Sequence, residues 1–242
     1  MTWDGATWAT AHLVRYPEPV TAAQLGSVGG PESALTWFYG PNRENDNAGI
    51  EQVVRAAVWI GFGYYAGRAT AETVFDEPES VVPALNTAAE AWHALLAPFQ
   101  HKGEFRFCER ERNAELNTAA GDLDPGGPVV VITSTGYRTD RELDISRPQA
   151  LLKGLVEVRQ NMATRDGLIV QQSADHPHPE MDGITFSIWR DDRAMLDFAY
   201  GAGHHRGQLD RHRDRSMFDR SAFTRLRPVR STGLWDGAKP IG

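Results

Sequence analysis

The order of apolar runs in the second half of the chain constrains the fold most. Four runs have the length and the β-branched or alternating composition of strands, and two longer segments have apolar residues at helical spacing. The predicted strands are residues 128–138, 168–174, 183–189 and 225–230, and the predicted helices are residues 144–167 and 190–215. The order strand, helix, strand, strand, helix, strand predicts an α+β unit with helices on one face of an antiparallel sheet.

The first half has a similar but less distinct outline. The predicted strands are residues 9–16, 55–65 and 101–111, and the predicted helix is residues 79–99. The run Asp-Pro-Gly-Gly-Pro at 124–128 indicates a linker, because these residues break both helices and strands. We therefore expect the fold class α+β, with two ferredoxin-like halves, residues 1–120 and 128–242, that form an α/β-barrel-like sandwich with antiparallel sheets.

The charge of the chain restricts its partners. A net charge of −7 argues against non-specific binding of nucleic acid, which depends on clustered positive charge. Arginines are concentrated between Arg190 and Arg230, where they form either a solvated helix face or a patch that attracts an anionic group. We expect a small-molecule partner and no nucleic acid.

The cysteine count and the apolar runs predict the cellular location of the protein. The chain has a single cysteine and therefore no intramolecular disulfide, as is usual in a reducing cytoplasm. Its first residues lack the basic and apolar regions of a signal peptide. No apolar stretch reaches the roughly 20 residues that a membrane span requires. These features predict a soluble cytoplasmic protein.

The stretch from Gly183 to Gly237 resembles a known family. It contains TFSIW, then D-x-x-A-M-x-x-F-A, G-x-H, F-x-x-x-x-F and a closing G-x-W-x-G at Gly233 to Gly237. This combination resembles the spheroidene monooxygenase family of haem-dependent dimeric α/β-barrel monooxygenases. The same group of tandem ferredoxin-like proteins includes the haem-containing aldoxime dehydratases. The family's glycine-rich loop is replaced here by TWFYGPNRENDNAG, which favours a more polar substrate than a carotenoid.

The resemblance implies haem b as cofactor, with His205 as the ligand of its iron. A neutral imidazole is a good ligand for haem iron, whereas the alternative for His205 is a solvated histidine beside a helix break. The neighbouring His204 is the main rival. The expected apolar contacts with the porphyrin are Phe186, Phe198 and Leu209, and the expected partners of its propionates are Arg206, Arg211 and Arg213.

A group that acts on an iron-bound molecule is expected from the first half of the chain. The candidates are Arg55, Trp59, Tyr64 and His93. A hydrogen bond or a proton from one of them would assist oxygen insertion or the departure of a hydroxyl group. The alternative for Trp59 is core packing, and the alternative for His93 is a solvated position at the rim.

Four functions are compatible with this sequence. The first is a haem-dependent monooxygenase-like oxidoreductase of biosynthetic metabolism, acting on a small or mid-sized organic substrate with an electron donor. The second is a haem-dependent dehydratase or nitrogen-centred bond-forming enzyme that resembles aldoxime dehydratase. The third is a cofactor-free monooxygenase, and the fourth is a haem-binding protein without enzymatic activity. A homodimer is compatible with all four.

Overall fold

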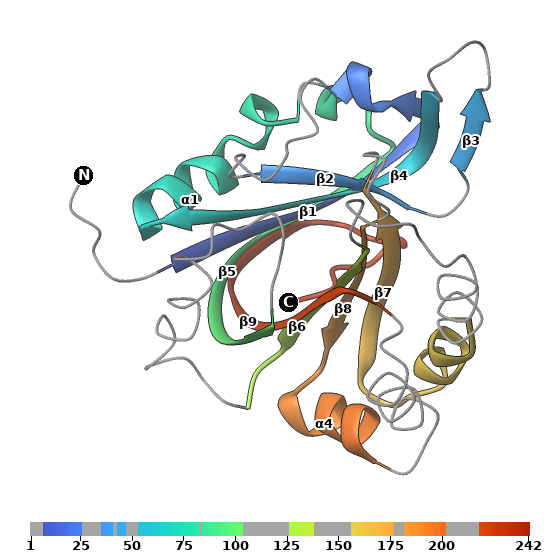
Figure 1. Ribbon diagram of the computed structural model, residues 1–242. Helices are drawn as coiled ribbons and strands as arrows, with labels where there is room; N and C mark the ends of the chain where they lie inside the picture. The colour runs from blue at the N-terminus through green and yellow to red at the C-terminus, as the bar shows by residue number, and fades with distance from the viewer. Residues whose placement is uncertain are drawn as a thin grey trace.

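The computed structural model describes residues 7–25, 35–40, 43–46, 53–82, 84–103, 126–137, 156–176, 182–201 and 218–242 (Figure 1). The strands are β1 (Thr7–Thr21), β2 (Leu35–Tyr39), β3 (Arg43–Asp46), β4 (Val53–Ala66), β5 (Glu90–Gly103), β6 (Val129–Gly136), β7 (Leu168–Asp175), β8 (Gly183–Trp189) and β9 (Arg220–Gly233). The α-helices are α1 (Arg68–Asp76), α4 (Asp192–Tyr200) and residues 156–163. Three short 3₁₀ helices are η1 (Ala22–Leu25), η2 (Pro78–Ser80) and η3 (Leu85–Thr87).

The antiparallel sheet closes on itself. Its strands follow the order β1-β5-β9-β6-β8-β7-β2-β4-β3, and β1 also pairs with β4. Eight strands therefore form a ring, with β3 added beside β4. The junction of β5 with β9 is long, running from Trp92 opposite Gly233 to Gly103 opposite Ala222. The other junction, β2 with β7, is a single pair, Tyr39 with Asp175.

The ring consists of two ferredoxin-like halves, as the sequence predicts. In the first half the strand order is β5-β1-β4-β2, and in the second it is β9-β6-β8-β7. If the four strands of each half are numbered along the chain, both halves have the spatial order fourth, first, third, second. The expected fold class, α+β with two such halves in an α/β-barrel-like arrangement, is therefore confirmed. Whether residues 1–120 and 128–242 are separate domains stays a prediction.

The alternation of side chains along each strand separates an inner face from an outer face. The inner face carries one continuous apolar cluster with members from strands of both halves, among them Leu13, Ile60, Trp92 and Phe186. The outer face of the second half packs against α4 through Val131, Trp189, Met195 and Phe198, among others. Figure 1 shows α1 and α4 outside the ring of strands, on opposite sides of the molecule. Side chains of the described residues therefore pack together inside the ring.

The prediction of a helix at residues 79–99 is wrong. Those residues form η2, η3 and most of β5. The strand lies between β1 and β9, and both of its faces are buried from Trp92 to Pro98, so the sequence reads as a continuous apolar run without alternation. Pro98 is tolerated within the strand because the register shifts between Pro98 and Gln100.

The helix predicted at 190–215 is shorter than expected in its described part. Helix α4 ends at Tyr200, and Gly201 is extended, with φ −62° and ψ 171°. Residues 202–217 lie outside the described residues.

Among the residues that are described, no helix combines the length and apolar composition that crossing a bilayer requires.

The closing G-x-W-x-G motif forms a turn whose tryptophan packs into the inner cluster. Gly233 and Gly237 both have positive φ, 89° and 74°, and Trp235 between them is 2% exposed. Trp235 belongs to the inner cluster, and Ile241 packs against that cluster from the C-terminal end. Figure 1 accordingly shows the C-terminus within the ring of strands. The glycines of the motif are therefore explained by backbone geometry.

This geometry predicts different costs for the two glycines. A Cβ on Gly233 would lie 2.1 Å from the carbonyl oxygen of Ala91, whereas a Cβ on Gly237 would meet nothing within 4 Å. Gly233→Ala is therefore expected to lower the free energy of unfolding by about 2–3 kcal/mol, and Gly237→Ala by only about 1 kcal/mol from its backbone conformation. Urea denaturation of both variants measures the difference. Equal losses would contradict the proposed close contact at Gly233.

Candidate functional site

The four residues expected to act on an iron-bound molecule do not face a common space. Arg55 is exposed on β4. Trp59 is fully buried, and its indole N–H donates to the carbonyl oxygen of Ala56 at 2.8 Å within an outer cluster of the first half. Tyr64 lies in the inner cluster, where its hydroxyl donates to Thr224 Oγ1 at 3.3 Å. His93 belongs to neither cluster, and it lines a surface pocket.

The apolar residues expected around the porphyrin are also divided between the two faces. Phe186 lies in the inner cluster and is fully buried. Phe198 lies in the cluster under α4, where its ring stacks on Trp189 with centroids 5.3 Å apart. Because neighbouring residues of a strand point to opposite faces, Phe186 and Trp189 cannot both face Phe198. The structure therefore does not bring Phe186 and Phe198 together.

The remaining residues expected to bind haem lie outside the described residues. These are His205, Arg206, Leu209, Arg211 and Arg213, together with the rival ligand His204. Within the part of the chain that the structure describes, no group of three or more His, Cys, Asp or Glu side chains is placed to hold a metal ion.

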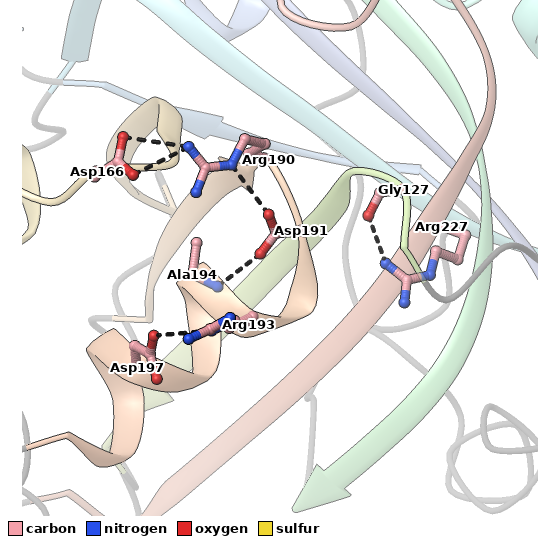
Figure 2. A network of polar contacts seen from close by, with 8 residues as sticks. All are labelled: Gly127, Asp166, Arg190, Asp191, Arg193, Ala194, Asp197 and Arg227. Carbon is pink, nitrogen blue, oxygen red and sulfur yellow. Dashed lines mark hydrogen bonds and ion pairs between the residues drawn. The ribbon is translucent and has the colours of Figure 1, made fainter.

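The start of α4 is fixed by a cap and by ion pairs (Figure 2). Asp191 is the N-cap, and its carboxylate accepts the backbone N–H of Ala194 at 2.8 Å. This hydrogen bond, followed by that from Arg190, holds the pKa of Asp191 below its usual value. Arg190 also binds Asp166, with N···O distances of 3.1 and 3.2 Å. These contacts tie the helix to the turn before β7.

Two arginines of β9 lie beside the same helix start. Arg227 is 5% exposed, and it pairs with Asp192 and donates to the carbonyl oxygen of Gly127 at 3.0 Å. Arg225 lies 3.5 Å from Asp192, and both guanidinium groups stand over the ring of Phe99. Arg225 Nε is buried and has no hydrogen-bond partner among the described residues. Sequence reasoning recognised the arginine-rich segment but not these two residues.

A second polar cluster occupies the outer face of β1 and β5. His12 Nδ1 and His93 Nδ1 lie 2.8 Å apart, and His12 Nε2 lies 2.9 Å from Thr10 Oγ1. Thr10 Oγ1 is in turn 3.3 Å from the hydroxyl of Tyr65. The side chain of His12 has no solvent exposure, and that of His93 is 5% exposed. These four side chains form one hydrogen-bonded chain, which we call the His12–His93 chain.

Both histidines of this chain are neutral at pH 7. Burial, and secondarily the nearby His93, lowers the pKa of His12 to about 3. Burial lowers the pKa of His93 to about 4, although Glu79 acts in the opposite direction. One Nδ1 must therefore donate to the other, and the two tautomers are coupled. Sequence reasoning missed His12. The only feature that could have indicated it was its position within the first predicted strand, residues 9–16.

The His93 end of the His12–His93 chain lines a pocket of about 600 Å³. The pocket lies between the start of β5 and the end of β9. Its lining residues are Arg15, Leu85, Ala88, Ala89, Glu90, Ala91, His93, Gly233 and Leu234. Because Nδ1 of His93 is held by His12, Nε2 is the ring nitrogen left for a ligand in this pocket.

The depressed pKa values predict a loss of stability in acid. The unfolded chain protonates its histidines near pH 6.5, whereas the folded chain does so near pH 3 and 4. The unfolded state therefore binds more protons below about pH 6.5, and each histidine lowers the unfolding free energy by up to about 1.4 kcal/mol per pH unit as the pH falls toward 4. His12→Gln should reduce this slope in urea titrations at pH 4.5 to 7.5. An unchanged slope would contradict the assignment.

The cap of α4 predicts a second stability effect. Asp191→Ala removes the acceptor of the Ala194 N–H and is expected to lower the free energy of unfolding by about 1 kcal/mol. Asp197→Ala is the matched control, because Asp197 is exposed and meets Arg193 only at 4.0 Å. Its effect should stay within about 0.5 kcal/mol. Thermal denaturation of the two variants checks this, and a larger loss for Asp197→Ala would contradict the role of the cap.

No protein-family model matches the chain. Spheroidene monooxygenase from Cereibacter sphaeroides is 35% identical over 65 residues, which cover 26% of this chain and 20% of that protein. The match thus spans about a fifth of that relative's length.

Solved structures resemble this fold along nearly the whole chain. An aldoxime dehydratase in complex with butyraldoxime has a TM-score of 0.50 and 12% identity, over 93% of this chain and 80% of that chain. A ferredoxin-fold protein from Listeria monocytogenes, related to antibiotic biosynthesis monooxygenases, has a TM-score of 0.29 and 12% identity, over 93% and 96% of the two chains. The likeness to the aldoxime dehydratase shows a shared fold along most of the chain.

Proposed function

We propose that the protein is a haem-dependent oxidoreductase of the monooxygenase-like class, with His205 as the ligand of the iron and a small or mid-sized organic molecule as substrate. Its local sequence match is to a monooxygenase, and its fold is similar to that of an aldoxime dehydratase, which support this proposal. An electron donor, a homodimeric state and a cytoplasmic location are parts of the same proposal.

The observation that carries the proposal is the structural role of the D-x-x-A-M-x-x-F-A motif, which caps α4 and packs it against the sheet. Its first residue, Asp191, caps α4, and Ala194, Met195 and Phe198 are the residues that bury the helix against the sheet. The motif therefore fixes the helix from which the segment containing His205 departs. A ligand of haem iron has to be held at a defined position, and a capped and buried helix supplies such a support.

The described residues near α4 fit a porphyrin in two respects. The cluster under the helix offers broad apolar side chains, with Phe198 and Phe99 among them. The guanidinium of Arg225 retains a buried N–H without a partner among the described residues, which suits a carboxylate. Arg206, Arg211 and Arg213 stay the proposed partners of the propionates.

The inner face of the ring fits a porphyrin less well. Phe186 is fully buried there, and its ring meets that of Trp92 with centroids 6.1 Å apart. A flat macrocycle between them would displace packed side chains from several strands. Because α4, which precedes the segment with His205, packs on the outer face, we propose that haem contacts Phe198, whereas the expected contact with Phe186 stays a prediction.

Bound haem would supply the redox chemistry of the reaction. The residues of the chain would hold the group, exclude water from its apolar faces and set the donor strength of His205 through the partner of its second ring nitrogen. The haem-dependent dehydratase stays the second proposal. The polar run NRENDN at 42–47, which suits a polar substrate, supports it.

Titration of the purified protein with haem tests the iron ligand. We expect an intense Soret band that shifts or disappears in His205→Ala, because the iron loses its imidazole. His204→Ala is the matched control and should keep the wild-type spectrum. A Soret band that survives in His205→Ala, or a protein that does not bind haem, would overturn the assignment.

Turnover distinguishes the remaining functions. A haem enzyme of the proposed class should consume an oxidant in the presence of substrate, whereas a dehydratase should act without one. Melting temperatures with and without haem provide an independent measure of binding, since a ligand that binds only the folded state raises the melting temperature. An unchanged melting temperature at saturating haem would contradict the haem site.

A further inference from the structure

We propose that the pocket beside His93 is a second ligand site, which binds a small uncharged molecule with an apolar body and a hydroxyl group. The site lies between the start of β5 and the end of β9, where residues of both halves line it. It shares no residue with the cluster under α4. The proposal does not depend on haem or on His205.

The two charged residues that line the pocket, Arg15 and Glu90, are already paired with each other. Arg15 NH1 lies 2.6 Å from Glu90 Oε2, and Arg15 NH2 lies 2.7 Å from Asp236 Oδ1. The second carboxylate oxygen of Glu90 accepts the backbone N–H of Gly237 at 2.7 Å. An anionic ligand would have to compete with two carboxylates for Arg15, and a cationic ligand would have to displace Arg15 from Glu90. The lining therefore favours a ligand without charge.

The His12–His93 chain provides the polar contact of the site. If Tyr65 donates to Thr10 and Thr10 donates to His12 Nε2, then His12 Nδ1–H donates to His93 and His93 Nε2 carries a proton toward the pocket. In the opposite direction, His93 donates to His12 and His93 Nε2 is an acceptor. A hydroxyl group both donates and accepts, so it matches the pocket in either arrangement of the chain.

The other contacts of the pocket are apolar. Leu85, Ala88 and Ala91 line it together with Leu234. Leu234 is 44% exposed, one of the few large apolar side chains in the described residues with so much accessible surface. An apolar body that covers Leu234 would remove this surface from water, which stabilises the complex by the hydrophobic effect. The ligand class thus follows from one hydrogen-bonding nitrogen, a neutral pair of charges and an apolar wall.

Phenol is the probe that tests this site, with toluene as its counterpart of similar size without a hydroxyl. Two-dimensional NMR of the histidine rings follows both titrations in protein free of haem. We expect saturable shifts of the His93 ring with phenol, with a Kd on the order of 1 mM, and binding of toluene about tenfold weaker. Equal affinities for the two probes, or no saturation with phenol, would overturn the proposal.

Two variants and a control locate the binding. His93→Phe keeps an aromatic ring but removes Nε2, and Leu234→Trp fills the pocket from an exposed position. Each should weaken phenol binding at least tenfold. Leu196→Trp makes the same exchange at an exposed leucine of α4 and should leave binding unchanged. Wild-type affinity in Leu234→Trp would overturn the proposal even if His93→Phe does not fold. The titration repeated in His205→Ala separates a failure of this site from a failure of the haem assignment.

Discussion

The closure of the sheet is the constraint on which the rest of the structure depends. Main-chain hydrogen bonds join the two ferredoxin-like halves at β5 with β9 and at β2 with β7, and the pairing of β1 with β4 completes the ring. The inner face of the ring is filled by side chains from both halves, with Trp92 and Phe186 in contact across it. Trp235 belongs to the same inner cluster, and Ile241 packs against it.

The alternation of side chains along the strands decides which chemical groups reach these outer surfaces. Trp92 and His93 are neighbours in sequence, but Trp92 belongs to the inner core and His93 lines an outer pocket. Likewise, Phe186 faces inward, whereas Trp189 supports α4 on the outer face. The two proposed sites thus lie on different parts of the outer surface. The first depends on the capped helix α4, and the second depends on the His12–His93 chain.

The second half of the fold could be predicted because its sequence contains the local signals of its structure. Strand β8 alternates apolar and polar residues, and α4 begins at an aspartate that caps it. Strand β5 could not be predicted in the same way, since burial on both faces removes the alternation and leaves a run that also suits a helix. His12 was missed because its role depends on His93, which lies 81 residues away in sequence. Only the pairing of β1 with β5 brings the two rings together.

The assignment of Phe186 and Phe198 to one slot shows the same limitation. Apolar residues near a predicted ligand can be selected from the sequence, but the face to which each belongs depends on strand parity and on where the helix packs. The most direct test of the account is a crystal structure of the protein grown with haem. The account predicts a macrocycle on the outer face beside Phe198, with His205 on the iron and with Trp92 and Phe186 still in contact. A macrocycle inside the ring, between Trp92 and Phe186, would contradict it.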